Sequence, residues 1–143
     1  MPNNNLELFT CPCCGYPTLP ERGGYYVCQL CKWEDDNQDD PHADKIWGGP
    51  NSFYSLTEAR INFSLYFIMY SPNAPTKRIS GNDNTPLEQE AKRAMVENFD
   101  AMLVTNDLET LSQLWYAIQK NKETLRNETK RKVREYEEQK AKK

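Results

Sequence analysis

Apolar residues recur at helical spacing through most of the chain after residue 55. Residues 55–58 (Ser-Leu-Thr-Glu) have the pattern of an N-terminal cap, and the apolar run behind them predicts a buried helix that ends at about Tyr70, before a proline. A second cap at residues 85–88 (Thr-Pro-Leu-Glu) opens an amphipathic helix. A third helix is predicted after Asn106. Its apolar face would be formed by Leu108, Leu111, Trp115, Ile118 and Leu125.

The N-terminal third has a different pattern, in which turn residues interrupt every short apolar run. The aromatic and β-branched run Tyr25–Val27 predicts one strand of a small hairpin. Residues 34–52 are acidic and rich in Pro and Gly, which predicts an irregular loop. Apolar residues are sparse beyond Leu125, so we expect a charged, solvated helical tail. The prediction is an α+β fold with a module at 1–47, a helical part at 48–119 and the tail at 120–143.

All five cysteines lie between residues 11 and 31, and four of them form two CxxC pairs: Cys11 with Cys14, and Cys28 with Cys31. Two cysteines separated by two residues can turn both sulfurs toward one point, and a hairpin can bring two such turns around one tetrahedral metal ion. The spacing therefore predicts a four-cysteine zinc ribbon on a short β-hairpin. Because four thiolates leave no open coordination position, we expect the zinc to be structural.

Other roles for these residues remain as alternatives. Cys13 is expected to face outward as an unliganded thiol, but it could replace Cys14 as a ligand or be reactive. A redox role for Cys11 and Cys14 would require a thioredoxin-like βαβ unit, which the prolines that follow disfavour. His42 is the single histidine and is expected on the surface. Since no nucleophile and base pair can be assembled around it, we predict that the protein is not an enzyme.

Acidic residues are concentrated directly after the second cysteine pair. An EF-hand calcium loop is excluded, because Asp40 stands where Gly is needed and Ile46 stands where the bidentate Glu is needed. The segment instead predicts an acidic docking surface for a basic protein. The alternative is a solvated loop without a partner, in which Glu34, Asp35 or Asp36 could accept hydrogen bonds from Arg60 or from loop amides before the first helix. The carboxylates predicted to bind the partner are Glu34, Asp35, Asp36, Asp39 and Asp40.

Several motifs follow one another in the order seen in a known family. They are Cys-Pro-Cys-Cys-Gly at residues 11–15, the second cysteine pair at 28–31, Trp-Glu-Asp-Asp at 33–36, Gly-Gly-Pro-Asn at 48–51 and Ser-Leu-Thr-Glu-Ala-Arg-Ile-Asn-Phe at 55–63. Residues 9–64 thereby resemble the bacterial cysteine-rich CPCC family. The resemblance implies a zinc-ribbon-like module that continues into a helix. It also implies an immunity-type protein that binds and neutralises a bacterial toxin.

Charge is distributed unevenly along the chain, whose net charge is -3. Residues 120–143 contain ten Lys/Arg and five Asp/Glu, whereas residues 1–119 contain eight and sixteen. The alternative function is therefore a nucleic-acid-binding zinc ribbon that uses the basic tail, although the acidic body disfavours it. No apolar run approaches the ~20 residues that span a bilayer, and the N-terminal residues have no export signal. We expect a cytoplasmic protein that does not interact with membranes.

Overall fold

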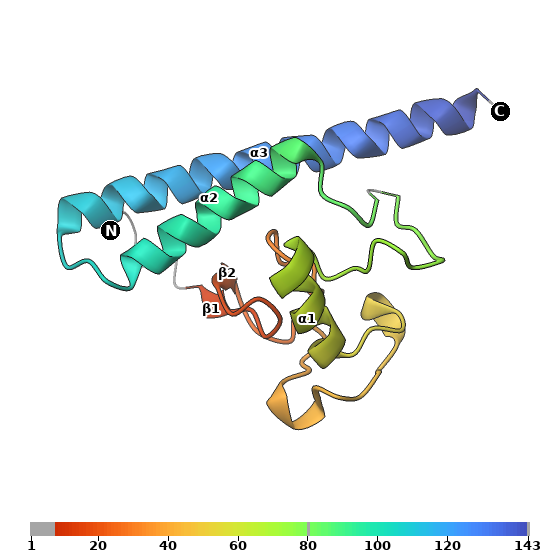
Figure 1. Cartoon of the computed structure of the whole chain (residues 1–143), viewed down its shortest axis with the longest axis horizontal. Helices are drawn as coiled ribbons and strands as arrows, with labels where there is room; N and C mark the ends of the chain where they lie inside the picture. Colours follow the sequence, from red (N-terminus) through yellow and green to blue (C-terminus); the bar gives the residue numbers. More distant parts are fainter. Residues whose placement is uncertain (1–7, 80, 143) are drawn as a thin grey trace. The chain divides into compact units, whose positions relative to one another are not determined.

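The computed structural model describes residues 8–79 and 81–142, and it divides the chain into two compact units on either side of the Ser71–Pro72 bond. The first unit contains strands β1 (Phe9–Thr10) and β2 (Pro17–Leu19), the 3₁₀ turns η2 (Asp40–His42) and η3 (Gly49–Asn51), and helix α1 (Leu56–Tyr66). The second unit contains α2 (Pro86–Met102) and α3 (Leu108–Ala141) (Figure 1). The predicted α+β class, a short hairpin followed by three helices, is confirmed.

The hairpin encloses the first cysteine pair and lies earlier in the chain than predicted. β1 and β2 are antiparallel neighbours, with Phe9 opposite Leu19. The predicted strand at Tyr25–Val27 is wrong. Tyr25 has a φ of 63°, and Val27 forms an isolated bridge outside the named strands. The positive φ takes the backbone out of the extended region that a strand ladder requires.

Helix α1 begins where its cap predicts and ends four residues early, at Tyr66. Ser55 Oγ accepts a hydrogen bond from the Glu58 N–H at 3.0 Å. At the other end Phe67 adopts a φ of 57°, and this left-handed residue terminates the helix. The chain then turns inward, and the Met69 N–H donates to the carbonyl oxygen of Cys31 at 2.8 Å. The last part of the predicted helix is therefore an irregular segment that enters the core.

The first unit has a small core of its own. Its fully buried apolar side chains are Leu19, Leu30, Trp33, Leu56, Ala59 and Met69. They come from β2, from the second cysteine turn, from α1 and from the segment after α1. The core therefore joins the two cysteine turns to the helix that follows them, and it holds both turns in place.

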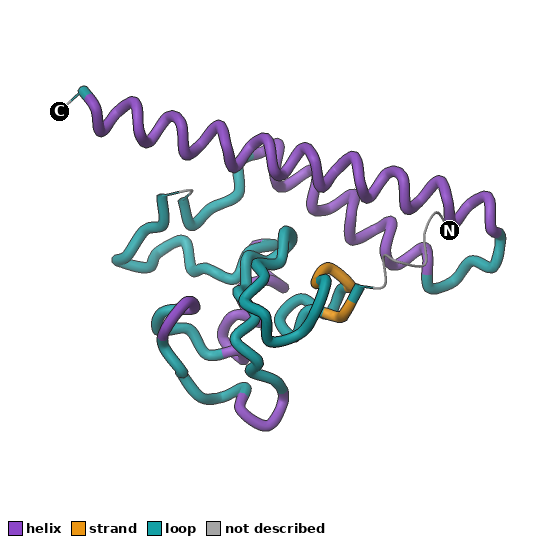
Figure 2. Tube along the Cα trace, turned by 180° about the vertical axis from the view of Figure 1, so that it is seen from behind, coloured by secondary structure: helices purple, strands orange, loops and turns teal. Residues whose placement is uncertain are grey.

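Helices α2 and α3 form an antiparallel pair and pack side by side (Figures 1 and 2). Thr85 caps α2 with both hydrogen bonds of the predicted capping box. Asp107 caps α3, one residue later than predicted. The apolar stripes seen in the sequence supply the contact. Their buried members are Ala91, Met95, Phe99, Ile118 and Leu125.

The segment expected to be a solvated tail is the C-terminal part of α3, which continues to Ala141. Glu128 is only 6% exposed, and its Oε2 accepts a hydrogen bond from Thr85 Oγ1 at 2.7 Å. Lys132 Nζ donates to Glu88 Oε1 at 2.6 Å. These polar contacts hold α3 against the start of α2 beyond the end of its apolar stripe. None of the described helices combines the length and the hydropathy needed to cross a bilayer.

Candidate metal centre

Two turns of similar shape present the two cysteine pairs. The Gly15 N–H donates to the carbonyl oxygen of Cys11 at 2.9 Å, and the Lys32 N–H donates to that of Cys28 at 2.8 Å. Gly15 and Lys32 both have a positive φ, of 81° and 73°. A left-handed residue directly after each pair turns the chain back, so that both sulfurs of the pair point to the same side. Lys32 adopts this conformation at a cost of about 1 kcal/mol.

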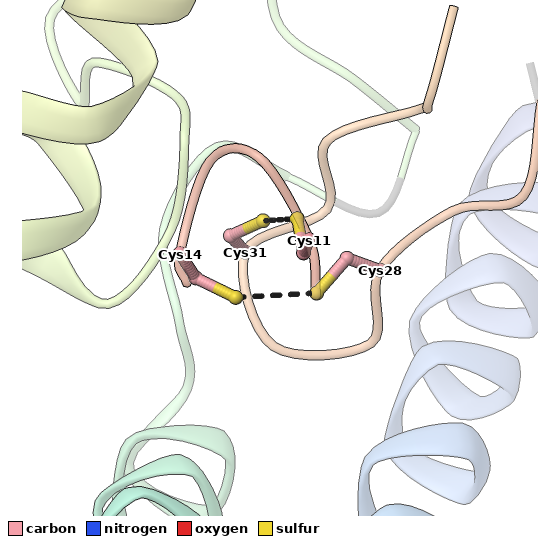
Figure 3. Close-up of side chains that lie close together, drawn as sticks. All are labelled: Cys11, Cys14, Cys28 and Cys31. Carbon is pink, nitrogen blue, oxygen red and sulfur yellow. Dashed lines mark hydrogen bonds between the residues drawn. The ribbon is translucent and has the colours of Figure 1, made fainter. Parts of the chain in front are cut away.

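The structure brings together the four cysteines of the two predicted pairs. The Sγ atoms of Cys11, Cys14, Cys28 and Cys31 all lie within 4.8 Å of one another (Figure 3). Cys11 Sγ and Cys31 Sγ are 3.6 Å apart, and Cys14 Sγ and Cys28 Sγ are 3.7 Å apart. A tetrahedral ion with metal–sulfur bonds of about 2.3 Å separates its sulfurs by about 3.8 Å. The cluster therefore has the dimensions of a tetrahedral four-sulfur site.

Hydrogen-bond donors reach the buried sulfurs and favour negative charge on them. Three of the four cysteines are fully buried, and Cys14 is half-buried. Thr18 Oγ1 donates to Cys28 Sγ at 3.0 Å, and the Trp33 N–H lies 3.4 Å from Cys31 Sγ. Such outer contacts orient ligands and tune their charge. Sequence reasoning missed Thr18, because a threonine in a short strand carries no signal of its own.

The buried thiols share their charge unequally. Burial acts to raise the pKa of Cys28, but hydrogen bonds from the three neighbouring thiols and from Thr18 hold that pKa well below its usual value. The pKa of Cys14 is raised well above its usual value, because its thiol hydrogen-bonds to its neighbours and because it is buried. The hydrogen bonds within the cluster thus favour a thiolate at Cys28, whereas burial opposes negative charge on its neighbours. A divalent cation would compensate the charge of the further thiolates.

A metal ion fits these residues. Tetrahedral sets of four thiolates suit zinc or iron. A bound ion would cross-link the two cysteine turns through Cys11, Cys14, Cys28 and Cys31. Structural zinc in small domains contributes an apparent ~10 kcal/mol or more to folding. Because the four sulfurs complete the coordination shell, the arrangement is suited to stabilising the fold.

Cys13 lies beside this cluster. The expectation that it faces outward is wrong, since it is only 7% exposed. A hydrogen bond with Cys31 acts to lower the pKa of Cys13, but burial and the neighbouring thiols raise it above its usual value. Cys13 lines a cleft of about 430 Å³ together with Arg22 and Arg60. A buried thiol with a raised pKa is poorly suited to nucleophilic or redox chemistry.

The acidic segment contains one carboxylate that belongs to the interior. Asp35 is fully buried, and it accepts hydrogen bonds from Arg22 Nε at 2.9 Å, from the Gly23 N–H at 2.6 Å and from the Asn37 N–H at 3.1 Å. Arg22 Nη1 also donates to Asp39 Oδ2 at 2.9 Å. The assignment of Asp35 to a docking surface is therefore corrected: it fixes the loop. A run of carboxylates in the sequence does not show which of them will be buried in an ion pair with an arginine.

The other predicted carboxylates lie at the surface or close to it. Glu34, Asp36 and Asp39 are half-buried and Asp40 is exposed. Asp40 Oδ1 accepts a hydrogen bond from Arg60 Nη2 at 2.7 Å, and Arg60 Nε donates to the carbonyl oxygen of Pro12 at 2.9 Å. Arg60 therefore links the acidic loop to the first cysteine turn. The sequence suggested Arg60 as a partner of Glu34, Asp35 or Asp36, whereas the structure pairs it with Asp40.

The fold and the buried four-thiol cluster define a small cysteine-rich protein suited to bind a metal ion. The sequence model of the family described as Cysteine-rich CPCC matches residues 9–90, more than half of the 143 residues. The chain belongs to this family. The match continues beyond residue 64, where the resemblance in the sequence ended, through the end of α1 and into the start of α2. No curated protein and no solved structure matches the chain.

Proposed function

We propose that this protein holds a structural zinc ion and acts, without catalysis of its own, by binding another protein. The buried four-thiol cluster carries the proposal, because it supplies a complete tetrahedral ligand set. A site of this kind rigidifies a small domain, and function then depends on the surface that the domain presents. Zinc suits the role better than iron because it has no redox chemistry.

The partner we propose is a basic protein. Residues 2–71 contain four Lys/Arg and nine Asp/Glu. Asp40 is exposed, and Glu34, Asp36 and Asp39 are half-buried beside it in the sequence. The role we infer is of the immunity type, in the cytoplasm, where the protein would bind and neutralise a bacterial toxin, as the resemblance of residues 9–64 implies. Long-range attraction between an acidic inhibitor and a basic toxin would speed their association.

Nucleic-acid binding through the C-terminal part of α3 is the second candidate. The concentration of Lys and Arg in residues 120–143 favours it. Several of these cations are already engaged, since Arg126 pairs with Glu123 and Arg131 pairs with Glu128 and Glu135. Fewer cations are then available to neutralise phosphates, so protein binding is the better-supported function.

Metal analysis and partner capture test the proposal. Protein purified under reducing conditions without chelator should contain one zinc per chain. A metal content below about 0.2 equivalents, or iron in place of zinc, would contradict the metal assignment. Metal-loaded protein should capture a basic protein from the cells that naturally produce it, and the association rate should fall steeply with salt. Tight DNA or RNA binding at physiological salt that is lost on removal of residues 120–143 would favour the second candidate.

A further inference from the structure

Three large apolar side chains are exposed in the loop between η2 and α1. Ile46 is 59% exposed, Trp47 44% and Phe53 45%. We call residues 44–53 the apolar loop. Apolar side chains scattered singly over a surface are ordinary, but three in one short loop leave apolar area that folding does not use. Tryptophan is also the residue most enriched among those that dominate binding energy at protein interfaces.

The apolar loop is closed at its base by direct hydrogen bonds. The Thr57 N–H donates to the carbonyl oxygen of Ala43 at 2.9 Å, and Thr57 Oγ1 donates to Asp44 Oδ1 at 2.6 Å. At the far end Tyr54 is buried, and its hydroxyl oxygen accepts from the Ser71 N–H at 3.1 Å. Both ends of the loop are thus attached to the unit that contains the cysteine cluster.

Asn51 attaches the middle of the loop to the acidic segment. Asn51 is 2% exposed. Its Oδ1 accepts from the Glu34 N–H at 3.0 Å, and its Nδ2 donates to the carbonyl oxygen of Glu34 at 2.8 Å. Gly48, Gly49 and Ser52 all have a positive φ, so the turn is tightly specified. A loop that is already ordered loses little conformational entropy when it binds.

The exposed rings rest against other side chains of the unit. The Trp47 ring lies 5.1 Å from the His42 ring, and the Phe53 ring is stacked on Tyr54 at 5.2 Å. These contacts support each ring on one side and leave nearly half of its surface open. Such an arrangement presents the rings to solvent as supported aromatic groups, which is the form that interface anchors take.

Carboxylates accompany the apolar loop. Asp44 belongs to it and is exposed, and Asp36 Oδ2 accepts a hydrogen bond from Asn51 Nδ2 at 3.4 Å. Glu34 is held beside them through its backbone N–H and carbonyl oxygen, which both bond to Asn51. Lys45 also lies in the loop and is exposed, but residues 2–71 as a whole carry nine Asp/Glu against four Lys/Arg. A partner that covers the loop therefore needs an apolar hollow for the rings and an excess of cationic groups around that hollow. We propose that the apolar loop is the anchor for a basic protein partner, with Trp47 as its central residue. This inference rests on the proposed function, and it adds where on the protein the basic partner would bind.

The test uses the full-length, metal-loaded protein and the basic protein that it captures. Trp47→Ala and, independently, Ile46→Asp should each weaken binding by at least 50-fold, mainly through faster dissociation. Metal content and melting temperature should stay at the wild-type values, because neither side chain fills the core. Tyr116→Ala is the matched control: Tyr116 is an aromatic residue on α3, in the other unit, and it is more exposed than Trp47, at 64% against 44%. Its loss should change binding by less than threefold.

The outcomes separate this inference from the proposed function. A captured basic protein that binds both loop variants as tightly as wild type overturns the anchor and leaves the protein-binding function standing. Failure to capture a basic protein overturns both. If wild-type protein self-associates at micromolar concentration and Trp47→Ala is monomeric, the loop is occupied by a second copy of the chain, and the basic partner is ruled out. Loss of binding in both loop variants but not in the control supports the anchor.

Discussion

At the scale of single residues, we expect the hydroxyl group of Thr18, beside the cysteine cluster, to increase the affinity for the metal. Thr18 Oγ1 donates to Cys28 Sγ at 3.0 Å. Thr18→Val keeps the shape of the side chain and removes the donor, so metal affinity should fall by about tenfold, at the lower end of what outer contacts to metal ligands contribute. Competition with a chelator of known affinity measures the change. The absorption bands of the cobalt-substituted protein should shift as well.

Thr18→Ser is the matched control for this experiment, because serine restores the hydroxyl and lacks only the methyl group. It should recover most of the lost affinity and the cobalt spectrum. If Val and Ser variants bind the metal equally well, the hydroxyl has no role beyond packing in β2. Thr57→Val, which removes a hydroxyl donor at the base of the apolar loop, should leave metal affinity unchanged.

The two kinds of cysteine should also behave differently. Cys28→Ser removes one sulfur from the four-thiol cluster and is expected to abolish tight metal binding and to unfold the first unit. Cys13→Ser should keep one metal per chain, because the other four sulfurs remain. Its melting temperature should fall by a few degrees, since Cys13 is buried and a hydroxyl replaces the thiol there. Metal loss in the Cys13 variant would show that this thiol, and not Cys14, is the fourth ligand.

The four cysteines of the candidate metal site could be predicted from their spacing in the sequence. The hydrogen bonds and ion pairs that support the site could not. The CxxC pairs identified the cysteines that the structure brings together, because sequence spacing itself determines whether both sulfurs of a pair can face one ion. Arg22 gave no such signal, and Arg60 was expected to bond to Glu34, Asp35 or Asp36 and not to Asp40. Their partners Asp35 and Asp40 lie on segments that only the folded chain brings together with them. Long-range pairs of this kind depend on the arrangement of several segments at once.

At the scale of elements, the helix starts were predicted better than the helix ends or the strands. The caps of α1 and α2 are local hydrogen bonds between residues three apart, so the sequence contains both partners. The end of α1 depends on Phe67 in a left-handed conformation, which a bulky residue adopts only when the surrounding fold requires it. The strand predicted at Tyr25–Val27 fails for a similar reason, because Tyr25 adopts a positive φ and leaves Val27 with an isolated bridge to Glu34.

An acid-sensitive contact joins α2 and α3. The hydrogen bonds from Arg131 and Thr85 lower the pKa of Glu128 from 4.5 to about 2. Because the pKa is lower in the folded state, the ionised carboxylate stabilises the fold at pH values above about 4.5, and this contribution is lost as the pH falls toward 2. Glu128→Gln should therefore cost about 1–2 kcal/mol at pH 7, a value reduced because Arg131 is partly exposed.

Thermal melts of the α2–α3 unit at several pH values measure this effect. The gap in melting temperature between wild type and Glu128→Gln should be about 5–10 °C at pH 7 and should close near pH 2. Glu90→Gln is the control, since Glu90 pairs with Arg93 on the exposed side of α2 and such pairs contribute little. A gap that does not change with pH would mean that the variant acts through packing and not through the charge of Glu128.

At the scale of the whole molecule, the two units are stabilised by different means. The first unit combines a small apolar core with the cysteine cluster, and α1 belongs to it because Leu56 and Ala59 enter that core. The second is a pair of helices with an apolar stripe and buried polar contacts at the start of α2. Helical periodicity in the sequence shows that a helix has a buried face, but it does not show which segment covers that face.

Removal of the metal should therefore unfold one unit and spare the other. With chelator under reducing conditions, the first unit loses the cross-link between its cysteine turns, which is worth an apparent ~10 kcal/mol or more in small zinc domains. Most of the helix lies elsewhere: α2 and α3 contribute 17 and 34 residues, against 11 in α1. The circular dichroism signal at 222 nm should fall by only about a fifth, while near-ultraviolet signals from the buried Trp33 disappear. Added zinc should restore them. A complete loss of the helical signal at 222 nm would instead mean that the two units fold as one cooperative body. An unchanged near-ultraviolet spectrum would mean that the metal does not hold the first unit together.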